Sequence, residues 1–461
     1  MNNRIPEATI FFDLETSDSI FMGQILNYCF IAVDADFNII EESYGDVLLS
    51  PLQIPTPEAI LTNRIDVMNH QKNSTQNEID AVKNIYDFIS RILKETSGIV
   101  PLIGYNSSRF DIPFLRTTLI RNGVNPYFNK ELVYRDLLHG VRKLSTTEKN
   151  FPRAAYSKEE PDKLSLKLET VCRELDLITG VQTHNSRDDV IITIDLAKKL
   201  IELFNFDIRI YESYEAEAFH RDRAKHPLIY SLKPNYELNA DSISVSTPLC
   251  LLDANHRSSL WINLDNFEET NDKSSISWFG VNSSQLVVSS ENTFSNEIMK
   301  LRDIALVKLS SVNLNNYFTI SNCDIEQDIY RLDFNDIKSL SEAIWNNDTR
   351  KLNASLNKNS KILYSRYKLS NFDIESKKNK QGIEILKKYA KYRYGGSAKI
   401  DKFDTSDECK RHRELSDYIS SIKRLSAEGS REDKELLKSL LSYIKDSAIV
   451  RHAGDELGLD I

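Results

Sequence analysis

Two acidic residues near the start of the chain have the spacing of a metal-binding pair. Asp13 and Glu15 lie in the segment 8–16, whose apolar side chains alternate with the period of a β-strand. Both carboxylates therefore point to one face, where their mutual repulsion and their burial beside apolar neighbours are costly. Divalent cations offset this cost, and Mg²⁺ commonly binds one or two carboxylates together with a substrate phosphate. A bare Asp-x-Glu pair is more often a solvated strand end, so the pair alone does not establish a site.

Three more residues, which lie later in the chain, strengthen this interpretation. Asp111 ends the segment YNSSRFD, which follows a strand predicted at 99–105, and strand-to-helix loops of α/β proteins often carry functional residues. His184 and Asp189 lie at the start of an apolar-rich helix predicted over 189–204. Judged alone, His184 is an ordinary loop histidine and Asp189 an acid favoured by the helix dipole. Four acids and one histidine in this order together favour a site for metal-assisted chemistry.

The elements that must position these residues alternate between strand and helix. Apolar residues at helical spacing over 79–93 predict a helix, and Thr75 with Glu78 forms a capping box before it. Strands are predicted at 8–16, 27–33, 39–49 and 99–105, with a turn at 34–38. Strands and helices in this order indicate an α/β domain with a mixed sheet.

The rest of the chain has a different sequence pattern. Short alternating segments over 206–347 predict a small β-rich domain with appended helices, and the polar stretch 351–380 resembles a linker. From Gly382 onward we expect charged helices, including a helical hairpin that turns near Gly429. We therefore divide the chain into three domains, at 1–205, 206–350 and 351–461.

Composition excludes several classes of protein. The chain of 461 residues is 41% hydrophobic and 28% charged, which is ordinary for a globular protein. No apolar run approaches the roughly 20 residues that span a bilayer. Five scattered cysteines without a CxxC pair, and an N-terminus lacking a signal-peptide core, predict a reduced, cytoplasmic protein without a zinc site. The net charge of −9 argues against coating of nucleic acid by bulk attraction, although a local basic track is compatible with it.

The order FDLET, then YNSSRFD, then a histidine with an aspartate five residues later resembles the DEDDh, or DnaQ-like, exonuclease superfamily. The similarity is closest to the bacterial exodeoxyribonuclease I family. It extends to PL at 248–249, HRS at 256–258, LY at 363–364 and YAKYRYGGS at 389–397. The resemblance implies an α/β protein with a ribonuclease H-like exonuclease domain, a small SH3-like β-rich domain and a C-terminal helical domain.

The resemblance also implies an activity and the residues that perform it. Members of this family degrade single-stranded DNA from the 3′ end, release nucleoside 5′-monophosphates and act in DNA repair and recombination. By position, the general base is His184 and the metal-binding acids are Asp13, Glu15, Asp111 and Asp189. Two Mg²⁺ ions, for which Mn²⁺ could substitute, would lie roughly 3.5–4 Å apart and clamp the scissile phosphate. Asp188 stands beside Asp189, and Asp189 is assigned because it keeps the family spacing.

Substrate contacts and partners follow from the same resemblance. The residues expected to bind DNA are Glu15, Thr16, Arg116, Tyr127, Arg142, Lys167, Arg257 and Tyr364. The cations among them would contact phosphates, and the two tyrosines would stack on unpaired bases. The segment 387–394 interleaves cations with aromatics, which suits either DNA binding or an amphipathic helix with a solvated face. The expected partners are single-stranded DNA and the acidic tail of single-stranded DNA-binding protein, with no membrane, and the protein is expected to be a monomer.

Two alternative functions are compatible with parts of the sequence. Another DEDDh enzyme, acting on RNA or as a polymerase proofreader, would need only the first domain, so the additional regions disfavour it. A non-catalytic single-stranded DNA-binding scaffold would not be expected to keep acids that are costly to hold together. Because the acids and His184 all precede residue 190, we expect the first domain alone to contain the metal site.

Overall fold

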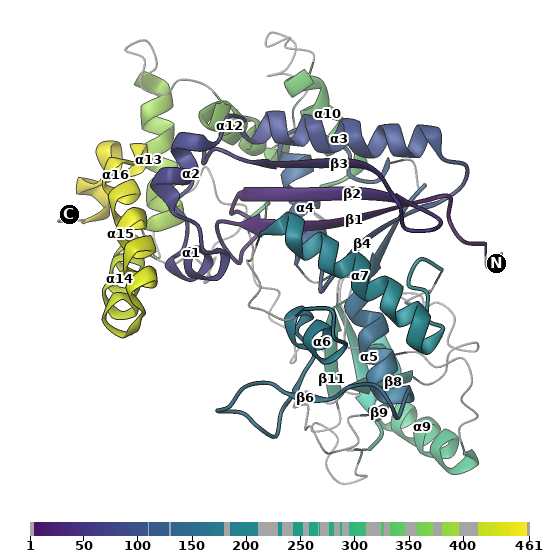
Figure 1. The fold of residues 1–461 in the computed structure, drawn as a ribbon. Helices are drawn as coiled ribbons and strands as arrows, with labels where there is room; N and C mark the ends of the chain where they lie inside the picture. The colour runs from purple at the N-terminus through teal and green to yellow at the C-terminus, as the bar shows by residue number, and fades with distance from the viewer. Residues whose placement is uncertain are drawn as a thin grey trace.

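The structure is a computed structural model. It describes residues 4–108, 110–128, 131–178, 185–210, 229–232, 243–251, 258–265, 267, 276–280, 286–287, 295–309, 324–326, 332–345, 356, 358–371, 380–395 and 414–458. Figure 1 shows a central sheet covered by helices, with the C-terminal helices α14, α15 and α16 gathered at one end. Within the described ranges, no helix is long and apolar enough to cross a membrane.

The central sheet is mixed and has the strand order β3-β2-β1-β4-β5. Its strands are β1 (Ala8–Thr16), β2 (Ile25–Asp34), β3 (Ile39–Asp46), β4 (Val100–Gly104) and β5 (Leu132–Asp136). The first three form an antiparallel meander, while β4 pairs parallel to β1 and β5 parallel to β4. The predicted α/β fold with a mixed sheet is therefore confirmed. The carboxyl ends of β1, β4 and β5 meet at one edge, where α/β proteins bind ligands.

Helices cover both faces of this sheet, and β1 divides its side chains between them as its alternation predicts. Ile10, Phe12 and Leu14 face a core shared with α3 (Glu78–Glu95) and α4 (Asp111–Arg121). Phe11 faces the opposite core, which contains α5 (Leu137–Thr147), α6 (Leu168–Glu174) and α7 (Ser186–Phe204). Between β3 and α3 lie two short helices, α1 (Pro57–Asn63) and α2 (Val67–Asn73).

The start of α3 differs from the prediction. The N-cap is Asn77, whose side chain accepts a hydrogen bond from the backbone N–H of Asp80 at 3.0 Å. The predicted capping box of Thr75 and Glu78 is therefore wrong. Asparagine is as good an N-cap as threonine, and Glu78 is used instead in an ion pair with Arg121.

A second, five-stranded sheet of order β11-β10-β9-β8-β12 follows the central domain. Its strands are β8 (Ile229–Leu232), β9 (Ile243–Leu251), β10 (Ser258–Asn263), β11 (Ile276–Gly280) and β12 (Leu286–Val287). Its small core includes Leu249, Ile262 and Phe267 and packs on α9 (Asn296–Leu309). A β-rich middle region is thus present, and a two-stranded ribbon of β6 (Ala154–Ala155) and β7 (Leu164–Ser165) lies between α5 and α6.

The C-terminal region is helical. Its helices are α10 (Phe334–Trp345), α12 (Lys358–Asn371), α13 (Lys380–Tyr394), α14 (Leu415–Glu428), α15 (Arg431–Asp446) and α16 (Ala448–Ala453). The helix α12 occupies the stretch expected to be a linker, and Leu363 and Arg366 on it are buried, so that expectation was wrong. The helical hairpin of α14 and α15 turns at Gly429 as predicted, with Ser430 capping α15.

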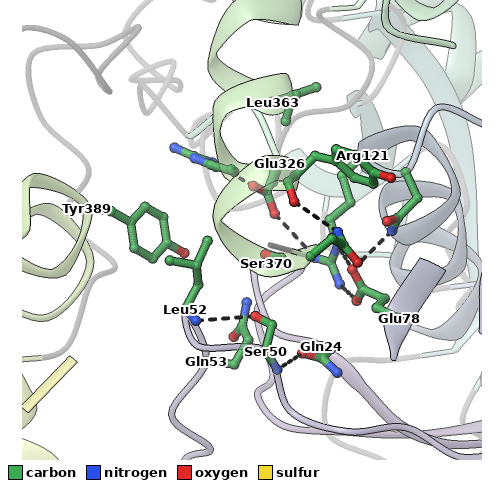
Figure 2. Close-up of a pocket in the computed structure, with 14 residues that line it drawn as sticks. Gln24, Ser50, Leu52, Gln53, Glu78, Arg121, Glu326, Leu363, Ser370 and Tyr389 are labelled. Carbon is green, nitrogen blue, oxygen red and sulfur yellow. Dashed lines mark hydrogen bonds and ion pairs between the residues drawn. The ribbon is translucent and has the colours of Figure 1, made fainter. Parts of the chain in front are cut away.

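The C-terminal helices share one hydrophobic core with the segment that joins β1 to α3. Residues of that segment in the core are Met22, Leu26, Leu49, Leu52, Ile54, Ile60 and Val67. A buried ionic network reinforces the contact. In Figure 2, Arg121 lies between Glu78 and Glu326, at 2.9 Å and 3.3 Å. Arg366 pairs with Glu326 at 2.8 Å and with Asp324 at 2.7 Å. The three-domain division stays a proposal, and its first and third parts are not separate bodies.

Candidate metal centre and substrate pocket

Three of the predicted acids converge at the carboxyl end of β1. Single carboxylate oxygens of Asp13, Glu15 and Asp189 all lie within 4.8 Å of one another. Asp13 and Glu15 project from β1 on the face that packs against α7, and Asp189 lies in the first turn of that helix. Its neighbour Asp188 is exposed, so the geometry agrees with the assignment of Asp189.

The start of α7 is tied to the sheet by contacts around Asp189. Asn185 caps the helix by accepting the backbone N–H of Arg187 at 3.0 Å. Ser186 donates a hydrogen bond to Asn27 on β2, which is the register partner of Glu15. The guanidinium of Arg187 binds both oxygens of Glu42 on β3, at 2.9 and 3.0 Å. These bonds fix where the first turn of α7 lies relative to the acids of β1.

Asp111 reaches the same region from the loop after β4. It begins α4, and its charge contributes to the raised pKa of Glu15, which places it close to the cluster. Asp136, at the end of β5, organises this loop by accepting the backbone N–H groups of Asn106 at 2.8 Å and Ser108 at 2.9 Å. Asp136 also receives the Ser108 hydroxyl at 2.7 Å. Its role could not be read from the sequence, because it depends on the parallel pairing of β4 with β5.

The carboxylates are held in surroundings that disfavour their charge. Burial, followed by the charge of Asp189, raises the pKa of Asp13 to about 8. Burial and then the charge of Asp13 raise the pKa of Glu15 to about 10. For Asp111, burial and the nearby charge of Asp13 hold the pKa well above its ordinary value. Acids that cannot all ionise unaided require a cation if they are to be charged together near neutral pH.

These shifts predict how the stability of the metal-free protein depends on pH. The unshifted pKa values are 3.8 for Asp13 and 4.5 for Glu15, and the folded values are higher, so the native state holds the extra protons. The contribution of these two groups to stability is therefore fully present in acid and is lost as pH rises from about 4 towards 10. We expect thermal melts in chelator to show this decline and Asp13→Asn to flatten it. The exposed neighbour variant Asp188→Asn should keep the wild-type slope, and an equal slope in Asp13→Asn would contradict the shifts.

An open pocket of about 290 Å³ lies beside the acids. This is close to the lower end of the range of about 300–1,000 Å³ for small-ligand sites. Its lining includes Glu15, Thr16 and Asp18 at the end of β1, residues of α1 such as Asn63, and Phe110 before α4. Glu15 and Thr16, which the sequence predicted to contact substrate, therefore face a space where a ligand can lie next to the carboxylates.

Other predicted substrate residues lie on the surface near aromatic rings. The guanidinium of Arg116 lies 4.4 Å from the ring centre of Tyr134 and 5.8 Å from that of Tyr127. Tyr127 is 44% exposed, so a face of its ring is accessible to an unpaired base. Lys167 caps the start of α6 and is exposed, with its ammonium group 4.0 Å from the ring centre of Tyr156. Their roles in DNA binding remain predictions.

Several other expected contacts are placed differently. Arg142 is 9% exposed on α5, and Tyr364 is 8% exposed and stacks on Tyr367, so little of either is available to a strand in this arrangement. In the segment 387–394, Tyr389, Tyr392, Arg393 and Tyr394 are all buried. The interleaved cations and aromatics therefore form a core helix, not a stacking surface. His184 and Arg257 lie outside the described residues.

Taken together, a carboxylate cluster at the carboxyl end of the parallel strands of a mixed sheet forms a candidate metal site on an α/β fold. No family model matches the chain. The sequence is 30% identical over 210 residues to exodeoxyribonuclease I of Buchnera aphidicola subsp. Baizongia pistaciae (strain Bp), a match covering 43% of this chain and 41% of that relative. The matched region thus spans about two fifths of the relative.

The likeness of fold is more extensive. The zinc-bound structure of an E. coli exonuclease I–single-stranded DNA complex superposes with a TM-score of 0.70 at 17% identity, covering 98% of this chain and all of the other. A structure of an exonuclease I–SSB-Ct complex gives a TM-score of 0.70 at 16% identity, covering 95% and 99%. The chain therefore has the exonuclease I fold over nearly its whole length. The resemblance to bacterial exodeoxyribonuclease I that its motifs predicted is confirmed.

Proposed function

We propose that this chain is a divalent-metal-dependent exonuclease that degrades single-stranded DNA from the 3′ end and releases nucleoside 5′-monophosphates. The observation that carries the proposal is the convergence of Asp13, Glu15 and Asp189 within 4.8 Å, next to an open pocket. The exonuclease I fold and the sequence match to exodeoxyribonuclease I support the choice of DNA as substrate. A role in DNA repair and recombination follows from that activity.

The residues present suit a hard divalent cation. All of the converging groups are carboxylates, which are the ligands that Mg²⁺ prefers. The pKa values of Asp13 and Glu15 are raised first by burial and then by repulsion from neighbouring acids, and a cation would remove this repulsion. Asp13, Glu15, Asp111 and Asp189 would hold two Mg²⁺ ions, for which Mn²⁺ could substitute. When bound, such ions polarise the scissile phosphate and stabilise the charge that develops on the attacking and leaving oxygens.

His184 is assigned as the general base that takes the proton from the attacking water. The unperturbed pKa of a histidine, about 6.5, suits a general base near neutral pH. His184 directly precedes Asn185, the N-cap of α7, so the chain brings it to the helix whose first turn carries Asp189. Glu15 and Thr16 would contact the terminal nucleotide in the pocket. Arg116, Arg142, Lys167 and Arg257 stay proposed phosphate contacts, and Tyr127 and Tyr364 proposed stacking residues.

Partners and location are proposed on the same basis. Single-stranded DNA is the substrate, and the fold likeness to an exonuclease I–SSB-Ct complex supports single-stranded DNA-binding protein as a protein partner. A monomer in the cytoplasm is consistent with this function.

The alternatives are separated by a comparison of substrates. Purified protein with Mg²⁺ is given equal concentrations of single-stranded DNA, blunt duplex DNA and RNA of one sequence. The proposal predicts rapid loss of the single-stranded DNA, with the other two largely intact. Preferred digestion of RNA would indicate an oligoribonuclease-like enzyme, and binding to single-stranded DNA without cleavage would indicate a scaffold.

Removal of the exposed ring at Tyr127 is expected to weaken binding of single-stranded DNA. Stacking of a base on an aromatic side chain is worth roughly 1–3 kcal/mol, so Tyr127→Ala should raise Kd by about 5- to 150-fold. The measurement is fluorescence anisotropy with labelled oligonucleotide in Ca²⁺, to limit cleavage. The matched control is Tyr44→Ala, whose ring on the edge strand β3 is 62% exposed and should leave Kd unchanged. Equal affinities of both variants would remove Tyr127 from the strand path.

A further inference from the structure

A buried ion pair joins the turn after β1 to the C-terminal helix α13. The Nη2 atom of Arg393 lies 2.6 Å from Oδ2 of Asp18, and the two side chains are 1% and 8% exposed. Burying two charges costs free energy that their attraction often fails to repay, so such a pair contributes little net stability. What the pair does achieve is to fix one conformation of the turn, and that turn forms part of the pocket.

The turn is organised around Asp18. The hydroxyl of Thr16 donates to the backbone carbonyl of Asp18 at 3.0 Å, and the other carboxylate oxygen of Asp18 accepts the backbone N–H of Ile20 at 3.3 Å. The side chain of Asn63 donates to the carbonyl of Thr16 at 2.9 Å. Thr16, Asp18 and Asn63 all line the pocket, and Thr16 follows directly after Glu15. The position of Asp18 therefore determines where Thr16 lies in the pocket wall next to the carboxylates.

The next residue of α13 holds the segment that leads to α1. The hydroxyl of Tyr394 accepts the backbone N–H of Ile54 at 2.9 Å and donates to the carbonyl of Leu52 at 3.1 Å. This segment leads to Thr56, which caps α1, lines the pocket and donates its backbone N–H to the carbonyl of Ser17 at 2.9 Å. Two consecutive side chains of α13 therefore fix both segments that enclose the pocket at this end.

The ion pair also affects the charge of the pocket wall. Glu15, Asp18 and Glu58 line the pocket, and a nucleotide is an anion. Divalent cations would neutralise the acids of the cluster, but Asp18 has its own positive partner in Arg393. Without that partner, Asp18 would present an uncompensated carboxylate to the incoming phosphate, and the two negative charges would repel each other at short range.

We propose that Arg393 is a positioning residue for the reaction, acting through Asp18 to shape the pocket for the 3′-terminal nucleotide and to cancel the charge of its wall. This inference rests on the proposed exonuclease function. The C-terminal helical region thereby contributes to how the terminal nucleotide is placed, although none of its described residues belongs to the carboxylate cluster.

The test compares steady-state cleavage of a single-stranded oligonucleotide by the full-length wild type and its variants. Arg393→Gln should raise KM by about tenfold or more, since small displacements of a positioned substrate are costly in rate and binding. Mn²⁺ binding to the cluster, measured by electron paramagnetic resonance, should stay unchanged. Arg393→Lys keeps the charge and should recover part of the loss, as should the neutral pair Asp18→Asn/Arg393→Gln.

The matched control is Arg366→Gln. Arg366 is equally buried, at 4% exposure, and lies 2.7 Å from Asp324, but neither residue lines this pocket. Its substitution should lower the melting temperature and leave KM unchanged.

A folded Arg393→Gln variant with wild-type KM and kcat would overturn the proposal, as would an equal rise of KM in Arg366→Gln. If Arg393→Gln does not fold, Arg393→Lys and Asp18→Asn decide, and an unchanged KM in both overturns it. A wild type that does not cleave DNA refutes the proposed function itself.

Discussion

Asp13→Asn is expected to lower the rate of single-stranded DNA cleavage by about 10³-fold or more, because metal ions supply several kcal/mol of charge stabilisation to the reaction. The same variant is expected to melt at a higher temperature than the wild type in chelator. Asparagine has nearly the shape of aspartate and removes one charge from a cluster in which burial and Asp189 raise the pKa of Asp13 to about 8. Cleavage rates in Mg²⁺ and melting temperatures in chelator measure the two effects.

The two effects together distinguish a metal site from a structural cluster. Asp189→Asn should behave like Asp13→Asn, because both side chains belong to the same group of carboxylates. Asp188→Asn is the matched control, since Asp188 is the exposed neighbour on the same turn, and it should cleave at the wild-type rate. Near-wild-type cleavage by Asp13→Asn in Mg²⁺ would show that the cluster does not hold the reacting metal ions.

His184→Ala is expected to slow the chemical step by about 10²- to 10⁴-fold, the usual range for loss of a general base. Extra Mg²⁺ should not restore the rate, because the carboxylates that hold the metal are intact. Single-turnover rates measured across pH test the assignment further. The wild-type rate should rise with pH near the pKa of a histidine, about 6.5, and the variant should lack this rise.

The control for this substitution is His452→Ala, which removes an imidazole from α16, outside the pocket lining. It should leave the rate and its pH dependence unchanged. Full activity of His184→Ala at neutral pH would remove His184 from the mechanism. Asn185, which caps α7, and the exposed Asp188 would then be the next residues to replace.

The proposed metal-binding acids could be picked out from the sequence because local patterns place them. Strand alternation puts Asp13 and Glu15 on the face opposite Ile10 and Phe12, and β1 has the predicted bounds. Parallel strands bring their carboxyl ends to one edge, which places Asp111 near that pair. These inferences need only the period of a strand and the topology that the motif order implied.

Contacts between segments far apart in sequence could not be predicted. The cations and aromatics of α13 have the pattern of a nucleic-acid surface, but Tyr389 is buried against Arg366 of α12 and Arg393 is buried in its ion pair with Asp18. The polar stretch predicted as a linker folds as α12 because Arg366 finds Asp324 and Glu326 as partners. In both cases the residue that determines the structure lies in another part of the chain, and local composition does not reveal it.

The expectation that the first domain alone contains the metal site stays a prediction, and contacts from other parts of the chain bear on it. All described acids of the cluster do precede residue 190, but the pocket beside them is held by Arg393 and Tyr394 from α13. Removal of everything after residue 205 would also expose Leu52, Ile60 and the other apolar residues of the segment that packs on the C-terminal helices. Variants of the full chain are therefore the appropriate tests.

The central claim is that the protein is a metal-dependent 3′ exonuclease. It is tested most directly by determining from which end a strand of DNA is shortened. The purified protein is mixed with a 5′-labelled linear oligonucleotide in Mg²⁺, and products are resolved on a sequencing gel and by chromatography. We predict a ladder that shortens from the 3′ end, release of nucleoside 5′-monophosphates and complete arrest by chelator, while a circular single strand stays intact. Cleavage of the circle, shortening from the 5′ end or an undiminished rate in chelator would contradict the assignment of a metal-dependent 3′ exonuclease.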